Sequence, residues 1–206
     1  MQVGGIVLCG GASRRMGRPK AWLPFGGETM LQRIGRILRE VVEPIVVVAA
    51  PEQELPALAG DVQVVHDAEE YRGPLQGLAT GLTALNGRVE AVYLSSCDVP
   101  FLLPNFVRRM IHLLGPHQIV VPEVAGFQHP LAAVYRVDVL PAVEELLAAD
   151  RLRPVFLFDR CRTRIVRFDE LADVDPDCRS LRNLNTPEEY ETALKNTFGS
   201  TPSANQ

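Results

Sequence analysis

Residues 6–20 read Ile-Val-Leu-Cys-Gly-Gly-Ala-Ser-Arg-Arg-Met-Gly-Arg-Pro-Lys, and this stretch decides the fold. The apolar run at 3–8 stops at two glycines, which predicts a buried parallel strand followed by a tight loop. Glycines let backbone N–H groups approach a ligand closely, and successive N–H groups in such a turn bind anions. Positive charge surrounds this loop, from Arg14, Arg15, Arg18 and Lys20. We therefore expect the loop to bind a phosphate-rich ligand, and a triphosphate suits it best.

Two common phosphate-binding loops do not fit this stretch. The P-loop requires Gly-Lys-Ser/Thr, but here Gly17 is followed by arginine and Lys20 by alanine. The dinucleotide fingerprint is absent as well, because Gly10 and Gly11 are adjacent. This spacing disfavours an oxidoreductase on a dinucleotide-binding fold. What remains is Leu-x-Gly-Gly-x-x-x-Arg-Met-Gly-x-x-Lys, for which the alternative interpretation is a surface turn with solvated arginines.

The composition is that of an ordinary globular protein. The chain has 206 residues, 47% of them hydrophobic and 22% charged, so we expect one domain over 1–195 and a polar, disordered tail over 196–206. A net charge of −4 argues against nucleic acid or an anionic membrane as a partner. We expect no membrane span, because no apolar run approaches the required length, and no signal peptide, because the first strand begins at once. Four widely spaced cysteines favour free thiols in a reducing cytoplasm.

Hydrophobic periodicity predicts an α/β fold with a mostly parallel sheet. We expect strands at 3–8, 45–49, 62–65, 91–94, 119–121 and 132–135. We expect helices from about residue 29 and at 51–58, 78–85, 104–114 and 137–149. In such sheets the ligand lies beyond the carboxyl ends of the strands. The glycine loop, Asp67 and Asp98 each follow a predicted strand and should meet there.

Asp98 lies in Ser-Ser-Cys-Asp-Val-Pro, directly after a predicted strand. Mg²⁺ prefers one or two carboxylates together with phosphate oxygens and water, so Asp98 is a candidate ligand. The alternative is a structural role as a helix N-cap.

The stretch Asn183-Leu-Asn185-Thr-Pro-Glu-Glu predicts the start of a helix. Thr186 is a natural N-cap, with Pro187 at the first helical position and Glu189 at the third. Capping does not explain Asn183 and Asn185, which stand on alternate positions of an extended segment and should face the same side.

These motifs resemble the molybdenum cofactor guanylyltransferases, the molybdopterin-guanine dinucleotide biosynthesis protein A family. The resemblance covers nearly the whole chain, from the glycine loop through Gly-Pro-Leu-x-Gly at 73–77, Cys-Asp-x-Pro at 97–100 and His-Pro at 129–130 to Asn-x-Asn-Thr-Pro-Glu. It implies a single-domain, Rossmann-like three-layer α/β/α sandwich of the nucleotide-diphospho-sugar transferase type. It also implies transfer of GMP from GTP to molybdopterin, with release of pyrophosphate and a need for Mg²⁺.

The same resemblance implies roles for particular residues. The catalytic residues would be Arg15, Lys20 and Asp98, with Asp98 as the metal ligand. The nucleotide would be bound by Leu8, Cys9, Gly10, Gly11, Lys20, Asp67, Gly77 and Asp98. The acceptor would lie near His129, Asn183 and Asn185, and some of the arginines at 151, 153, 160, 162, 164, 167, 179 and 182 could face its phosphate. Proteins that deliver the labile cofactor or accept the product are further expected partners.

Three alternatives stay open. Ala49 stands where the guanylyl enzymes often have an asparagine, so a cytidylyltransferase of the same family is the nearest rival. Another nucleotidyltransferase of the same fold, for instance one acting on a sugar phosphate or a different pterin nucleotide, is the second. A nucleotide-binding module without turnover is the third, and the presence of Lys20, Asp98 and both asparagines argues against it.

Overall fold

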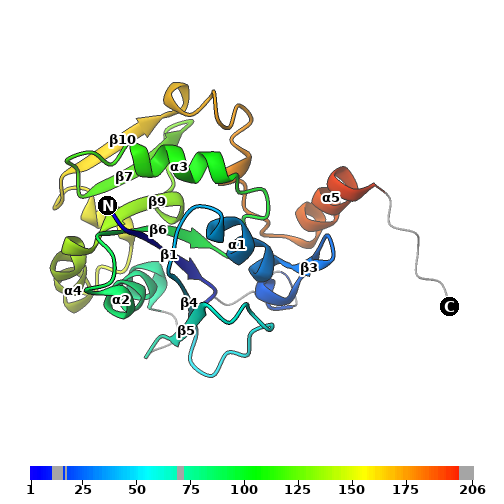
Figure 1. Ribbon diagram of the computed structural model, residues 1–206, viewed down its shortest axis with the longest axis horizontal. Coiled ribbons are helices and arrows are strands. Elements are labelled where there is room, and N and C mark those ends of the chain that lie inside the picture. The colour runs from blue at the N-terminus through cyan, green and yellow to red at the C-terminus, as the bar shows by residue number, and fades with distance from the viewer. Residues whose placement is uncertain (11–15, 17, 69–71, 200–206) are drawn as a thin grey trace.

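The computed structural model describes residues 1–10, 16, 18–68 and 72–199. Its centre is a mixed sheet with the strand order β10-β7-β9-β6-β1-β4-β5, and β8 pairs with β7 outside this path (Figure 1). The strands are β1 (Val3–Leu8), β4 (Ile45–Ala49), β5 (Val62–His66), β6 (Ala91–Ser96), β7 (Ile119–Val124), β8 (Phe127–Gln128), β9 (Ala133–Arg136) and β10 (Thr163–Arg167). A separate two-stranded hairpin is formed by β2 (Pro24–Phe25) and β3 (Glu28–Thr29).

Strand β1 lies in the middle of the parallel half, as the continuous apolar run predicts. It pairs in parallel with β4 and β6, so that Leu8 lies beside Val48 on one side and Ser96 on the other. Strand β5 completes this half in parallel with β4. Since these strands run in the same direction, the residues that follow them gather at one edge of the sheet.

The other half of the sheet contains the antiparallel elements. Strand β9 runs antiparallel to both of its neighbours, β6 and β7, and β10 is parallel to β7. The prediction of a mostly parallel sheet in an α/β fold is confirmed.

Helices cover both faces of the sheet and form two separate cores. The helices are α1 (Met30–Arg39), α2 (Gly73–Leu85), α3 (Pro104–His112), α4 (Leu140–Ala148) and α5 (Pro187–Phe198). The first core contains most buried residues of α1 and those of α3, and the second contains buried residues of α2 and α4. A third, smaller cluster joins α5 to the β2–β3 hairpin through Phe25, Phe101 and Leu184. Helix α5 projects from one side of the body (Figure 1).

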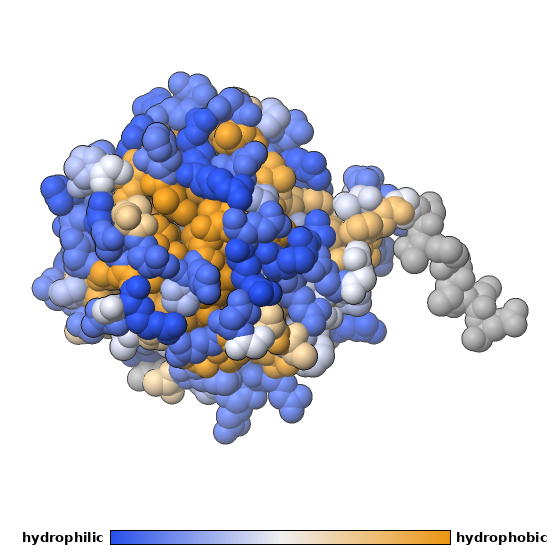
Figure 2. Space-filling model, in the orientation of Figure 1, coloured by the Kyte–Doolittle hydropathy of each residue, from blue (hydrophilic) through white to orange (hydrophobic). Residues whose placement is uncertain are grey.

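The surface differs in hydropathy from one region to another. Figure 2 shows apolar residues gathered in the middle of one face and surrounded by hydrophilic residues. Within the part of the chain that the structure describes, no helix is long and apolar enough to cross a membrane.

Several predicted element boundaries were wrong. Residues 51–58 form no helix, because Pro56 interrupts the segment and disfavours helical geometry at the residue before it. Helix α2 begins at Gly73 rather than at residue 78, with Pro74 inside its first turn, where a missing N–H costs nothing. The predicted helix at 137–149 is a 3₁₀ turn at Val137–Val139 followed by α4.

Residues 196–198, which were predicted to belong to the disordered tail, are helical. Helix α5 continues to Phe198, where the Phe25 and Phe198 rings meet edge to face at 5.2 Å between centroids. An aromatic contact of this geometry stabilises the last turn of the helix against the hairpin. The remainder of the tail, from residue 200, lies outside the described residues.

Candidate active site

Four polar side chains meet at the carboxyl edge of the sheet, although they lie far apart in the sequence. Asp98 follows β6, Lys20 begins a 3₁₀ turn after the glycine loop, and Asn183 and Asn185 precede α5. The Lys20 ammonium donates to Asp98 Oδ2 at 2.6 Å and to Asn185 Oδ1 at 2.8 Å. Asn183 Nδ2 donates to Asp98 Oδ1 at 2.9 Å. The prediction that both asparagines face the same side is confirmed, because both amides reach the Lys20–Asp98 pair.

The Asp98 carboxylate is buried and fully engaged. The residue is 8% exposed, and its Oδ1 accepts a second hydrogen bond, from Ser96 Oγ at 2.6 Å. A buried charge is tolerated only where it is paired and hydrogen-bonded, and the three contacts from Lys20, Ser96 and Asn183 satisfy that condition. The alternative role as an N-cap is wrong, since α3 begins after Leu103 and has no side-chain cap.

The helix that follows the asparagines begins as predicted. Thr186 and Glu189 form a capping box, in which Thr186 Oγ1 accepts from the Glu189 N–H. The Glu189 carboxylate also accepts from the backbone N–H of Asn185 at 2.7 Å. The capping box therefore fixes the backbone of Asn185 as well as the start of the helix. The Thr-Pro-Glu-Glu sequence thus helps to position a residue of the site.

The end of β1 supplies the backbone predicted to bind the nucleotide. Leu8 and Cys9 are buried, and Gly10 is exposed beside the end of β4, where an added Cβ would lie 3.4 Å from the Ala50 nitrogen. Burial, a hydrogen bond with Cys97 and the nearby charge of Asp98 raise the pKa of the Cys9 thiol well above its usual range. Cys9 is therefore a neutral side chain at pH 7 and no nucleophile. Gly11, predicted to bind the nucleotide, and Arg15, predicted to be catalytic, lie outside the described residues.

Gln53 makes two contacts near the site that the sequence did not indicate. Its amide donates to the Cys9 carbonyl at 3.3 Å and accepts from the Ala50 N–H at 2.9 Å. The side chain thus ties the end of β1 to the end of β4, beside Ala49. Because residues 51–58 were predicted to be helical, the sequence analysis did not assign this role to Gln53.

Asp67 and Gly77 lie together on the α2 side of the same edge. Asp67 Oδ1 accepts from Thr80 Oγ1 at 2.6 Å, and partial burial raises the pKa of the Asp67 carboxyl. Gly77 allows α2 to approach β1, because a Cβ there would lie 2.8 Å from Leu8 and 3.7 Å from Asp67 Oδ2. Its immediate role is this close packing beneath the predicted nucleotide site.

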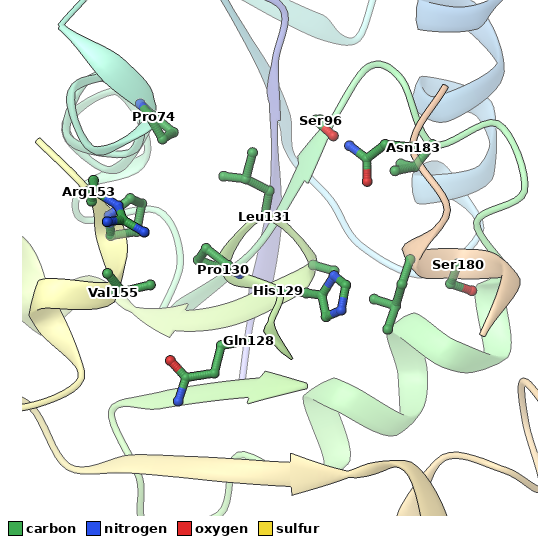
Figure 3. A pocket seen from close by; sticks show the side chains of 14 residues that line it. Pro74, Ser96, Gln128, His129, Pro130, Leu131, Arg153, Val155, Ser180 and Asn183 are labelled. Atoms are coloured by element: carbon green, nitrogen blue, oxygen red, sulfur yellow. The ribbon is translucent and has the colours of Figure 1, made fainter. Parts of the chain in front are cut away.

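A pocket of about 320 Å³ is lined in part by Ser96 and Asn183, the two residues whose side chains donate to Asp98 Oδ1. Figure 3 shows it between the start of α2, the end of β6 and the segment that carries Asn183. The polar side chains that line it are Ser96, Gln128, His129, Arg153, Ser180 and Asn183. Desolvation lowers the pKa of His129, so its imidazole is neutral at pH 7. The volume is at the lower end of the range for small-molecule sites.

The arginine-rich segment mostly has other partners. Arg153 lines the pocket. Arg160 pairs with Glu145 and Arg164 with Glu170, at 3.0 and 2.6 Å. Arg151 stacks on the Phe156 ring at 4.0 Å, and Arg179 and Arg182 lie over Phe101. Arg153 is the one of these arginines that lines the pocket, and the expectation that some of them face an acceptor phosphate stays a prediction.

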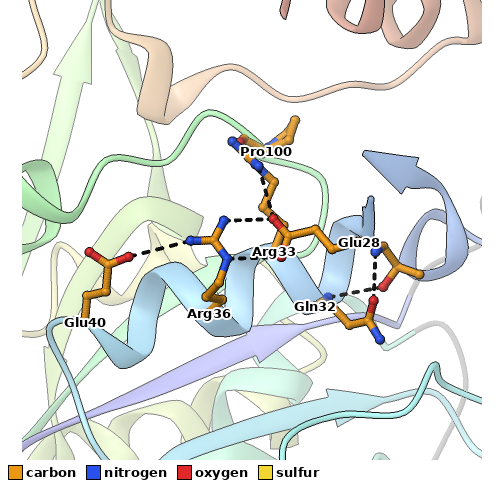
Figure 4. A network of polar contacts seen from close by, with 7 residues as sticks. Glu28, Gln32, Arg33, Arg36, Glu40 and Pro100 are labelled. Carbon is orange, nitrogen blue, oxygen red and sulfur yellow. Dashed lines mark hydrogen bonds and ion pairs between the residues drawn. The ribbon is translucent and has the colours of Figure 1, made fainter. Parts of the chain in front are cut away.

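A network of charged residues supports the segment that carries Asp98. Arg33 donates to the carbonyl of Pro100 at 2.7 Å and pairs with Glu28 at 3.1 Å. Glu28 also accepts two hydrogen bonds from Arg36, at 2.8 and 3.1 Å (Figure 4). This network joins the β2–β3 hairpin, α1 and the loop after Asp98, so the position of the carboxylate depends on three elements.

The oxygens around Lys20 suit a hard cation. In the described part of the chain no group of three acidic, histidine or cysteine side chains forms a complete metal cage. Asp98 Oδ2 and Asn185 Oδ1 nevertheless hold the positive charge of Lys20 between them. One carboxylate with neighbouring oxygens is the donor set that Mg²⁺ uses when a substrate's phosphates and water complete its shell. The residues present therefore fit a magnesium–nucleotide complex.

Comparison with known proteins finds relatives by sequence and by fold. The MobA-like NTP transferase domain matches residues 5–163. The molybdenum cofactor guanylyltransferase of Desulfosudis oleivorans is 34% identical over 93% of this chain and 94% of its own length. The probable molybdenum cofactor guanylyltransferase of Mycobacterium avium is 34% identical over 90% of this chain and 92% of its own. The crystal structure of molybdopterin-guanine dinucleotide biosynthesis protein A from Archaeoglobus fulgidus shares the fold, with a TM-score of 0.76 and 19% identity over 93% of this chain and 97% of that one.

Proposed function

This chain is a nucleotidyltransferase of the MobA-like NTP transferase domain family, and we propose that it transfers GMP from GTP to molybdopterin, forming the guanine dinucleotide of the molybdenum cofactor. The observation that carries the proposal is the convergence of Lys20, Asp98, Asn183 and Asn185 beside a pocket. Three distant segments build this group, and its ammonium and carboxylate are what phosphate transfer with a divalent cation requires. The names of the relatives support guanine as the base.

In the proposed reaction an oxygen of the acceptor's terminal phosphate attacks the α-phosphorus of GTP. A new P–O bond forms, the bond between the α-phosphorus and the bridging oxygen breaks, and pyrophosphate carries away the electron pair. A phosphate acceptor is ionised at neutral pH, so no strong general base is needed. The site's contribution is alignment and stabilisation of negative charge.

The residues would divide this work between the two substrates. Lys20 would offset the charge of the triphosphate, together with Arg15, while the N–H groups from Gly10 onward would orient it. Leu8, Cys9, Gly11, Asp67 and Gly77 would shape the nucleotide side of the site. Mg²⁺ would be held by Asp98 and would neutralise phosphate charge. The ammonium of Lys20 is already within 2.6 Å of that carboxylate, so both cationic functions are concentrated at one point.

The pocket is the proposed acceptor site. Asn183 both lines the pocket and donates to Asp98, and this supports an acceptor site beside the proposed point of transfer. The guanidinium of Arg153 can pair with the acceptor's phosphate, and neutral His129 can donate or accept a hydrogen bond with a pterin. Asn185 would complete the edge nearest the nucleotide.

The chain offers a matched control for a test of Lys20. Lys20 and Lys195 are its two lysines, and Lys195 is exposed on α5. We expect Lys20→Ala to reduce kcat/KM for pyrophosphate release from GTP and molybdopterin by at least about 100-fold, because a charge-stabilising group aimed at the transition state is lost. Lys195→Ala should stay within twofold of the wild type.

The outcomes separate the possible functions. Equal activity of the two variants would reject the role of Lys20. Turnover with CTP in place of GTP would make the protein a cytidylyltransferase and direct attention to Ala49. Nucleotide binding without pyrophosphate release would support a module that has no turnover.

A further inference from the structure

Ser96 is a buried polar residue of the site to which the proposed function gives no role. It is the last residue of β6, is 8% exposed, and its hydroxyl donates to Asp98 Oδ1 at 2.6 Å. It also lines the 320 Å³ pocket (Figure 3). We infer that Ser96 is a positioning residue that fixes the orientation of the Asp98 carboxylate toward the cation, an inference that rests on the proposed function.

The two oxygens of Asp98 have different tasks. Oδ1 accepts hydrogen bonds from Ser96 Oγ and Asn183 Nδ2, whereas Oδ2 faces the Lys20 ammonium. The terminal torsion of an aspartate is broad, so a carboxylate without partners samples many orientations. Two donors on Oδ1 hold the plane of the group and leave Oδ2 directed at a cation. Mg²⁺ demands near-ideal octahedral geometry, so its affinity depends on this orientation.

The two donors to Oδ1 come from different parts of the chain. Asn183 belongs to the segment before α5, while Ser96 is two residues from Asp98 at the end of a central strand of the sheet. The strand holds Ser96 in place, since Ser96 is paired with Leu8 of β1, and β9 pairs with the other side of β6 as far as Leu94. Ser96 is therefore the donor that fixes the carboxylate to the sheet.

The neighbouring serine provides the control. Side chains alternate across a strand, so Ser95 and Ser96 point to opposite faces of the sheet. The hydroxyl of Ser95, which is 1% exposed, donates to the carbonyl of Ser96 at 3.2 Å. Ser95→Ala therefore removes a buried hydroxyl from the same strand without removing a contact to Asp98.

The test measures metal binding without turnover. Binding of Mn²⁺, followed by electron paramagnetic resonance, and binding of GTP with Mg²⁺ or with EDTA, followed by calorimetry, would be compared in wild type, Ser96→Ala, Ser95→Ala and Asp98→Ala. We expect Ser96→Ala to weaken Mn²⁺ and Mg²⁺-dependent GTP binding about tenfold, because partners that orient a metal ligand typically contribute at least this much. Binding in EDTA should be unchanged, Ser95→Ala should match the wild type, and Ser96→Thr, which keeps the hydroxyl, should restore most of the affinity.

The outcomes distinguish the inference from its premise. If Asp98→Ala abolishes metal-dependent binding while Ser96→Ala equals the wild type, the role of Ser96 is rejected and the metal site stands. If Asp98→Ala has no effect either, the metal assignment itself fails. If Ser95→Ala and Ser96→Ala weaken binding equally, the serines only stabilise the strand, and the inference is wrong. Circular dichroism melting of each variant confirms that it is folded at the assay temperature.

Discussion

Two glycines in helices predict opposite effects of the same substitution. A Cβ at Gly81 of α2 would lie 2.6, 2.8 and 2.9 Å from three atoms of the Ile6 side chain. Ile6 is fully buried and β-branched, so it has no room and few rotamers with which to move away. A Cβ at Gly35 of α1 would meet no atom within 4 Å. Gly81→Ala should therefore destabilise the protein, and Gly35→Ala should stabilise it.

The magnitudes follow from two opposing effects. Overpacking a buried site costs about 1–3 kcal/mol, and we expect a value of about 2–3 here because all three close atoms belong to one rigid side chain. Replacing glycine by alanine in a helix recovers about 1 kcal/mol. The net loss of unfolding free energy for Gly81→Ala is thus about 1–2 kcal/mol, while Gly35→Ala should gain about 0.5–1 kcal/mol.

The assay is equilibrium unfolding in urea, with calorimetry as a second measurement. For a domain of this size about 1 kcal/mol corresponds to about 2–4 °C in Tm, so the two variants should melt on opposite sides of the wild type. A Gly81→Ala variant as stable as the wild type or more stable would refute the packing argument, whatever happens at Gly35.

Three further predictions concern the site and its supports. Thr186→Ala removes the cap of α5 and should lower the unfolding free energy by about 1 kcal/mol in urea titration; no loss would mean that Glu189 alone holds the helix start. The hydrogen bond from Arg36 holds the pKa of Glu28 below its usual 4.5, so the stabilisation by Glu28 is present above pH 4.5 and is lost as pH falls through the lowered pKa. The difference in unfolding free energy between wild type and Glu28→Gln should accordingly shrink in acid, and a constant difference would contradict this. Trp22 is the single tryptophan, 45% exposed in the 3₁₀ turn that contains Lys20, so GTP should change the intrinsic fluorescence of the wild type; a change of equal size in Trp22→Phe would show that the signal comes from elsewhere.

The sequence alone determined the features that depend on local chemistry. The bounds of β1 were predicted correctly from an apolar run that ends at two glycines. A buried strand and its end depend on residues that are consecutive in the sequence. The same holds for Thr186 and Glu189, which form a capping box whatever lies around them. Carboxylates after parallel strands must meet at one edge, so Asp67 and Asp98 could be placed there.

Tertiary structure decided whatever depends on distant segments meeting. Only the packing of the segment before α5 against the end of β6 brings Asn183 to Asp98, and only the folded sheet shows that Ser96 rather than Ser95 faces the carboxylate. The contact of Gln53 and the pocket position of Arg153 could not be predicted from neighbouring residues. Nothing in the local sequence distinguishes this glutamine from others in loops, or this arginine from the other arginines near it. Local structure arises from neighbours along the chain, whereas a site built from several segments exists only when burial of the two cores brings those segments together.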